Sequence, residues 1–316
     1  MPIPVASPQP LPSIALDLWR ETRDRLHEYV QVVGDVRKHH APHHPHWWHA
    51  SLRVSSYGLT TTPLSMDDGR QLELVFDFSA GHLNVVVRES AADGAPDNST
   101  NSVRVGAVAL DGRPSRQFAD SLARLLQGQR IEPGFNPEAH ETETEDTRAT
   151  PARAPIQFDR AAARNWWQTV LWLSSQLESL TQDLPGETGP VQLWPHHFDL
   201  ATTWFSGRWI PDADPDDPDN GREQMAFGFS SGDTVIDDPY LYVTAYPWAE
   251  GLAKASLPAP GRWVTDEWQG AVLEYESLRQ SADPVDLVQG FFRSAHSAGT
   301  ASLQSQARAP VTGDAP

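Results

Sequence analysis

The sequence predicts an α+β fold made of two similar halves, each running helix, antiparallel sheet, helix. Three observations support this prediction. Apolar residues recur at three- and four-residue steps in four segments, and they alternate with polar residues in several shorter segments. These segments also follow the same order on both sides of a polar stretch. A sheet with one apolar face needs a cover, so we expect each sheet to pack against helices or the other half.

The helices are predicted from the spacing of apolar residues. The segments with this spacing are residues 14–33, 114–127, 160–180 and 284–297. In the first of them Leu26, Val30 and Val33 share one side of the predicted helix, and Gly34 follows as a stop signal. A loop rich in His and Pro is expected after Gly34.

The strands are predicted from alternation between apolar and polar residues. Residues 71–80 alternate, and after Gly81 the residues Leu83, Val85 and Val87 do the same, which predicts a hairpin. Further strands are expected in residues 51–58, 103–110, 190–194, 225–230, 240–246 and 271–275.

Several positions repeat between the two halves. Trp19 and Trp167 are separated by the same number of residues as His49 and His197, and a Phe-x-Phe-Ser-x-Gly motif occurs in each half. We interpret this register as a structural duplication, with the two halves related by a pseudo-twofold axis. The alternative is two unrelated α+β stretches that share a common order of elements.

The repeat and the polar stretches define the expected organisation. Residues 14–298 form a single domain, with a first half at 14–131, an acidic linker at 132–155 and a second half at 156–298. The flanking segments 1–12 and 299–316 are expected to be disordered.

Composition excludes several classes of function. The formal net charge is −18, which argues against nucleic acid as a partner. No apolar run is long enough to span a membrane, and the N-terminus does not have the pattern of a secretion signal, so a cytoplasmic protein is expected. The chain has no cysteine, so it has no disulfide, thiolate metal site or cysteine nucleophile. Twelve tryptophans are many for this length, and the oligomeric state is left open.

Three segments resemble an uncharacterised bacterial family known only as a domain of unknown function. They are His46-Trp47-Trp48-His49, Tyr57-Gly58-Leu59-Thr60-Thr61, and Phe198-Asp199-Leu200-Ala201-Thr202 continuing to Phe205-Ser206-Gly207-Arg208. A subgroup with Leu-Trp-Pro before the third segment is most similar, as at Leu193-Trp194-Pro195, although His196 stands where an acidic residue is expected. The resemblance covers residues 14–298 and implies one continuous domain, but no activity, cofactor or partner.

The first candidate site is a metal centre. His46, His49, His197 and Asp199 occupy matching places in the two halves, and three imidazoles with one carboxylate suit zinc or another divalent metal. The alternative is that His46 and His49 cap backbone groups or are core histidines bonded to backbone, since His-x-x-His alone is a weak signal.

The second candidate site is an aromatic cleft between the halves. Trp47, Trp48, Trp194 and Trp204 would form its walls, or else part of the core. Arg208 would bind an anionic group of a ligand, or else pair internally with Asp199.

The functional hypotheses follow from these two sites. The first is small-molecule binding in the aromatic and histidine-lined cleft. The alternatives are a metal-dependent hydrolase using His46, His49, His197 and Asp199, and a non-catalytic interaction or dimerisation protein. The sequence does not decide whether the protein is an enzyme.

Overall fold

The computed structural model of the chain describes residues 10–88, 102–141, 153–211, 213–214, 217, 221–248, 251–266 and 268–308. Its helices and helical turns are η1 (Leu16–Leu18), α1 (Arg20–His40), η2 (Pro45–Ala50), α2 (Ser115–Gly128), η3 (Pro137–Glu141), α3 (Arg160–Asp183), η5 (Leu252–Lys254), α4 (Tyr275–Arg279) and α5 (Pro284–Arg308). Its strands are β1 (Arg53–Val54), β2 (Leu59–Thr60), β3 (Leu64–Ser65), β4 (Gln71–Asp77), β5 (His82–Arg88), β6 (Ser102–Ala109), β7 (Glu187–Thr188), β8 (Gln192–Trp194), β9 (Asp199–Trp209), β10 (Arg222–Ser230), β11 (Tyr240–Tyr246), β12 (Arg262–Val264) and β13 (Gly270–Glu274). Helices and antiparallel strands form separate runs, which confirms the α+β prediction.

The strands form two antiparallel sheets, one in each half. The first sheet has the order β1-β2-β4-β5-β6, with β3 beside β4, and the second has the order β12-β13-β11-β10-β9-β7, with β8 beside β9. An isolated antiparallel bridge between Leu52 and Leu193 connects the two sheets. Both sheets are built mainly from neighbouring strands that follow one another in the chain, as the predicted repeat implies. The pseudo-twofold relation itself stays a prediction, because connectivity does not define an axis.

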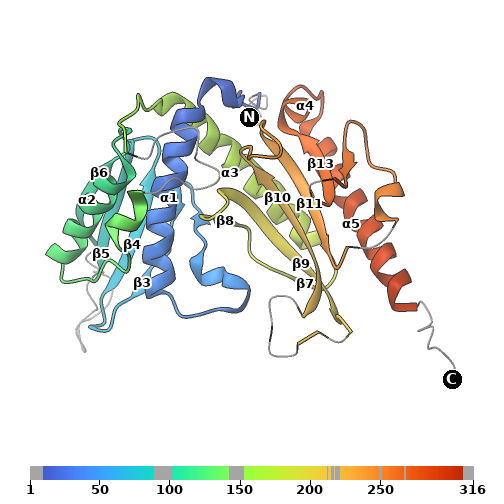
Figure 1. Cartoon of the computed structure of the whole chain (residues 1–316), viewed down its shortest axis with the longest axis horizontal. Helices are drawn as coiled ribbons and strands as arrows, with labels where there is room; N and C mark the ends of the chain where they lie inside the picture. The colour runs from blue at the N-terminus through green and yellow to red at the C-terminus, as the bar shows by residue number, and fades with distance from the viewer. Residues whose placement is uncertain are drawn as a thin grey trace, which may run out of the picture.

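The first sheet is covered on one face by α1 and α2 (Figure 1). The predicted hairpin is formed by β4 and β5, in a register that places Leu74 opposite Val85 and Phe76 opposite Leu83. These four side chains are completely buried. Alternation along the strands therefore gives this sheet one apolar face for the helices, and the other face carries polar residues such as Glu73.

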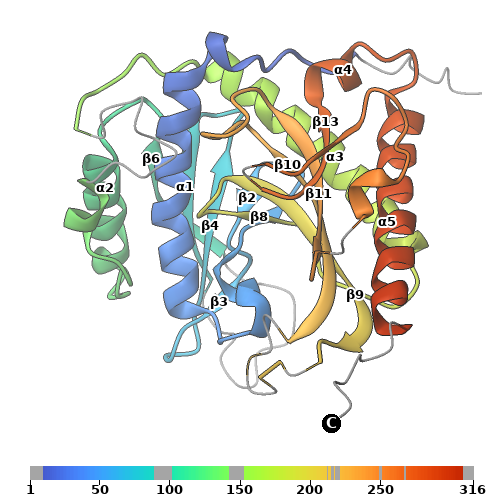
Figure 2. The same cartoon turned by 45° about the vertical axis from the view of Figure 1, so that its right-hand side comes forward.

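The second sheet is covered by α3 and α5 on one face only (Figure 2). Phe227 on β10 packs edge-on against Phe292 of α5, and Trp204 on β9 packs edge-on against His296 of the same helix. The residues that alternate with them are smaller and point to the opposite face, towards α1.

The halves share one hydrophobic core. Trp167 on α3, in the second half, stacks on Phe78 from the first half with ring centroids 5.5 Å apart, and Trp166 lies 6.4 Å from Trp19. Trp19 and Trp167 occupy matching positions in the predicted repeat, and both are buried at this junction. No helix in the described ranges is both long and apolar enough to cross a membrane.

Three boundaries differ from the predictions. Gly34 does not end the first helix, because α1 continues to His40 and includes the first histidines of the expected loop. The last helix continues to Arg308, so residues 299–308 of the segment predicted to be disordered are helical. Part of the predicted linker is ordered as η3, which packs on α2, whereas residues 142–152 lie outside the described residues. The terminal residues 1–9 and 309–316 also lie outside them.

Gly34 has a packing role that explains why the helix continues through it. A Cβ at this position would lie 2.7 Å from both Cβ and Cγ of Pro195, which follows β8 in the second half. Neither proline atom can rotate away. Gly34→Ala is therefore expected to lower the free energy of unfolding by about 1–3 kcal/mol through overpacking, despite the higher helix propensity of alanine.

The matched control is Gly290→Ala in α5, where the new Cβ would meet only Pro258 Cγ at 3.8 Å. That substitution is expected to raise the free energy of unfolding by up to about 1 kcal/mol. Urea denaturation of both variants measures the two effects. Equal effects of the same sign would contradict the proposed contact between α1 and Pro195.

Candidate functional site

A cleft of about 920 Å³ lies between α1 and the open face of the second sheet. The middle of its floor has small side chains, Ala201 and Thr203 on β9 and Ala226 on β10, with the larger Gln224 and Tyr242 beside them. These residues alternate with the large apolar ones that pack on α3 and α5, so the small side chains leave room above the sheet. We call this space the central cleft. Its volume is near the upper end of the range for ligand pockets, about 300–1,000 Å³.

One wall of the central cleft is a polar stripe along α1. Glu28, Gln31, Asp35 and Lys38 follow one another at three- and four-residue steps and all line the cleft. This spacing places the four side chains on one side of the helix. His140 of η3 lies beside this stripe, and its Nε2 is 3.2 Å from Oδ2 of Asp35. The segment predicted as a solvated linker therefore contributes a residue to the cleft.

Glu28 is buried at the base of this stripe. Its Oε2 lies 2.8 Å from Nε of Arg25, and its side chain is 5% exposed. Burial disfavours the ionised carboxylate and raises the pKa of Glu28 to about 7, although the charge of Arg25 and a hydrogen bond from Ser115 act in the opposite direction. The cleft thus contains a carboxyl group that exchanges its proton near neutral pH.

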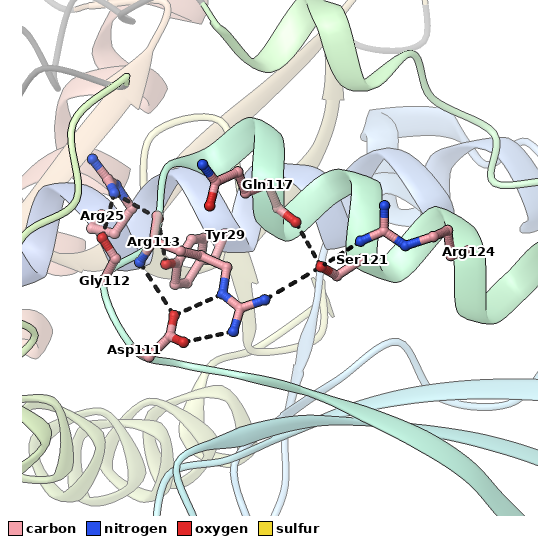
Figure 3. A network of polar contacts seen from close by, with 8 residues as sticks. All are labelled: Arg25, Tyr29, Asp111, Gly112, Arg113, Gln117, Ser121 and Arg124. Atoms are coloured by element: carbon pink, nitrogen blue, oxygen red, sulfur yellow. Dashed lines mark hydrogen bonds and ion pairs between the residues drawn. The ribbon is translucent and has the colours of Figure 1, made fainter.

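Arg25 is held by backbone carbonyls from the loop before α2 and from the segment before α3. Its guanidinium donates to the carbonyl oxygens of Gly112 and Arg113 at 2.8 and 2.6 Å, and to that of Ala154 at 2.9 Å. Tyr29, one helical turn on, donates its hydroxyl to the carbonyl of Arg113 (Figure 3). These bonds fix α1 against the start of α2, and so they fix the polar stripe.

The opposite end of the central cleft is lined by rings from η2. Trp47 and Trp48 line it together with His46, and Nζ of Lys38 lies 5.0 Å from the centre of the Trp47 ring. His46 and Trp47 have φ of 59° and 58°, a left-handed conformation that side chains rarely adopt. His44 stacks on Trp48 with ring centroids 4.6 Å apart. Two consecutive left-handed residues turn the chain so that the aromatic side chains face the cleft.

Trp194, the last residue of β8, also lines the cleft, and the turn that follows it is anchored to α1 by His27. Nε2 of His27 lies 3.0 Å from the carbonyl oxygen of Pro195 and 3.1 Å from that of His196. The imidazole stacks on Phe198, and burial lowers the pKa of His27 to about 3. His27 is therefore neutral at physiological pH, and its Nε2–H donates to the turn.

Asp199 lies at the start of β9, where the floor meets this turn. It accepts a hydrogen bond from the hydroxyl of Tyr242 on β11. Burial and the carboxylate of Asp199 raise the pKa of Tyr242 well above its usual value, so the phenol stays protonated. His197, Asp199 and Tyr242 also form the edge of a second, smaller cavity.

The four residues predicted to bind a metal are not brought together. His46, His197 and Asp199 line the central cleft, but His49 is buried beside it, with Nδ1 3.2 Å from the backbone nitrogen of His44. Among the described residues, no three His, Asp or Glu side chains are grouped so as to hold a metal ion. The alternative reading of His49, a buried group bonded to backbone, agrees with its position.

The predicted ligand residues are divided between two places. Trp47, Trp48 and Trp194 line the central cleft. Trp204 lies on the covered face of the same sheet, is 5% exposed, and donates its indole N–H to the carbonyl of Pro185. Arg208 also lies outside the cleft.

Arg208 has a different partner from the one considered in the sequence. Its Nη2 lies 2.6 Å from Oε2 of Glu223 on the neighbouring strand β10. Asp199, the partner expected from the sequence, is at the opposite end of β9 and bonds Tyr242 instead. The prediction that Asp199 pairs with Arg208 is therefore wrong, because the two residues lie at opposite ends of one continuous strand.

Sequence reasoning missed Glu28, His140 and Tyr242 as cleft residues. Glu28 had a signal, since polar residues at helical spacing run along α1 opposite Leu26, Val30 and Val33. His140 and Tyr242 had none, because only the packing of η3 and the pairing of β11 bring them to the cleft.

These features define an α+β protein of two joined sheets with an aromatic and acidic cleft between its halves. The chain belongs to a family of unknown function (DUF5996), which matches residues 11–309. The family resemblance noted in the sequence is thereby confirmed. None of the curated proteins or solved structures compared with the chain matches it.

Proposed function

We propose that the protein binds a small organic molecule with a flat ring in the central cleft. The observation that carries this proposal is a volume of about 920 Å³ bounded by three tryptophans, Trp47, Trp48 and Trp194, over a floor of small side chains. Partly exposed aromatic rings around a concave space are typical of ligand sites, since they offer stacking surfaces at little cost in side-chain entropy.

The charges of the cleft favour a ligand without a carboxylate or phosphate. Glu28, Asp35 and Asp199 contribute acidic groups to the wall, and Lys38 contributes a basic group beside Trp47. The whole chain also carries a formal net charge of −18. An anionic ligand would be repelled by this field.

Indole and indole-3-acetate are suitable probes, because they share one ring and differ by a carboxylate. Indole is expected to bind saturably by isothermal titration calorimetry, and indole-3-acetate more weakly. Trp194→Ala should weaken indole binding roughly tenfold by removing a stacking surface. The control is Trp209→Ala, which removes an exposed tryptophan outside the cleft and should leave the affinity unchanged. If the wild type, Trp194→Ala and Trp209→Ala bound indole with equal affinity, the proposal would be contradicted.

A second candidate function is proton transfer to or from a ligand in the same cleft. Glu28 supports it, because this buried carboxyl lines the cleft and burial raises its pKa to about 7, which suits a general acid or base at neutral pH. Metal-dependent hydrolysis has no comparable support, since the described residues hold no group of metal ligands.

A further inference from the structure

A second cavity of about 310 Å³ adjoins the central cleft behind Asp199, and we call it the side cavity. The two spaces have a common boundary of His197, Asp199 and Tyr242. Its other walls come from β10, the loop after it, β11 and the residues before β13, and they include Tyr240 and Trp268. It therefore belongs to the second half alone.

Three aromatic rings surround the side cavity. Tyr240 and Tyr242 point to the same face of β11, with ring centroids 6.2 Å apart and planes inclined by 55°. The ring of Trp268 lies 6.3 Å from that of Tyr240. Because the faces of aromatic rings carry negative potential, three rings lining one space favour a cation there.

Two glycines make room for these rings. A Cβ on Gly228, which is paired with Tyr242 across the sheet, would lie 2.4 Å from Cζ of that tyrosine. A Cβ on Gly270 would lie 2.1 Å from Cζ3 of Trp268. The rings thus lie over backbone that has no side chain, and any other residue at either position would displace them.

Two carboxylates hold the tyrosines and give the cavity a negative wall. Tyr240 donates its hydroxyl to Asp233 Oδ2 at 2.5 Å, and Tyr242 donates to Asp199. Of the described residues that line the side cavity, none is Lys or Arg. The cavity therefore combines π faces and negative charge, and both attract a cation.

The hydrogen bonds of Asp233 indicate which kind of cation fits. Its Oδ2 accepts from Tyr240, and its Oδ1 accepts from the backbone N–H groups of Val235 and Ile236 at 2.7 and 2.9 Å. Both oxygens are engaged by the protein. A primary ammonium needs acceptors for three N–H groups, whereas a quaternary ammonium has no N–H group and spreads its charge over methyl groups that fit against rings.

We propose that the side cavity is a binding site for a quaternary ammonium group, held by Tyr240, Tyr242 and Trp268 and by the charge of Asp199 and Asp233. This site is separate from ring stacking in the central cleft. A molecule with both parts would place its ammonium behind Asp199 and its flat body over the floor of β9 and β10.

Choline and its neutral carbon isostere 3,3-dimethylbutan-1-ol test the proposal, because they have the same shape and differ in charge. Choline is expected to bind the full-length protein in the millimolar range or tighter, and the isostere at least about tenfold more weakly. Trp268→Ala should reduce choline affinity at least about tenfold, and Trp268→Phe should restore part of it. Asp199→Asn, which keeps an acceptor for Tyr242, should also weaken choline binding.

Crossed controls separate this inference from the proposed function. Trp194→Ala should leave choline affinity unchanged, and Trp268→Ala should leave indole affinity unchanged. The inference is overturned if choline does not bind, if the isostere binds equally well, or if Trp268→Ala has no effect while its circular dichroism spectrum matches that of the wild type. Loss of indole binding alone would overturn only the proposal for the central cleft.

Discussion

Acidification from pH 7 to pH 4 is expected to remove about 3 kcal/mol of folding free energy through the single side chain of His27. Burial lowers the pKa of His27 from 6.5 to about 3 in the folded protein. The unfolded chain therefore binds a proton below pH 6.5 that the folded chain does not bind until about pH 3. The stabilising contribution is present above pH 6.5 and is lost as the pH falls through this window.

His27→Gln tests this expectation, because the amide Nε2 is able to donate to the carbonyls of Pro195 and His196 but does not titrate. Urea denaturation of both proteins at pH 7 and at pH 4 should show the wild type losing about 3 kcal/mol more than the variant. His43→Gln, which replaces an exposed imidazole, controls for histidine substitution as such. An equal loss in wild type and His27→Gln would mean that His27 is not held neutral by burial.

Glu28→Gln is expected to make the protein more stable at alkaline pH relative to the wild type. Burial raises the pKa of Glu28 from 4.5 to about 7, so the folded state binds this proton more tightly than the unfolded state. The contribution is favourable below pH 4.5 and is lost as the pH rises to about 7. Between pH 5 and pH 8 the wild type should lose about 2 to 3 kcal/mol through this group.

The measurement is the difference in unfolding free energy between wild type and Glu28→Gln at pH 5 and at pH 8. The variant should lack the loss that the wild type shows. Arg25 remains bonded to three backbone carbonyls in the variant, so its guanidinium is not left without acceptors. Glu73→Gln, on the outer face of the first sheet, is the matched control for the loss of one carboxylate. A wild-type profile parallel to that of Glu28→Gln would contradict the raised pKa.

These two residues show why the first helix decides the shape of the cleft. His27 and Glu28 are neighbours in the sequence, and both are buried. His27 donates to the turn that follows Trp194, and Glu28 lines the cleft and pairs with Arg25. The pH dependences of the two side chains are opposite in sign, so they partly cancel between pH 4.5 and pH 6.5.

Local periodicity was sufficient to predict the helices α1, α2, α3 and α5 and the β4–β5 hairpin, but it did not predict β9, the strand that contributes Ala201 and Thr203 to the cleft. The alternation around Phe76 gave the β4–β5 hairpin, and the helical spacing in residues 284–297 lies within α5. Both patterns record which side of an element is buried, and that side is set by nearby residues. The stop predicted at Gly34 was wrong because glycine there serves close packing against Pro195, a contact between distant segments.

The candidate site was predictable only in part, for the same reason. Trp47, Trp48 and Trp194 had a signal in the segments that resemble the family, and they line the cleft. The pair Asp199–Tyr242 joins two strands of the sheet that are separated by β10, so no spacing in the sequence indicates it. Trp204 also lies in a tryptophan-rich segment, as Trp194 does, but its position in the alternation of β9 places its side chain on the covered face, against α5.

The central claim, that the cleft binds a flat ring through its tryptophans, is tested most directly by indole N–H resonances in a ¹⁵N NMR titration. The chain has twelve tryptophans, and single Trp→Phe variants assign their signals. Adding indole should shift the resonances of Trp47, Trp48 and Trp194 saturably, with one dissociation constant, and leave the buried Trp166 unchanged. Shifts confined to the exposed Trp209, or shifts that do not saturate, would contradict the account.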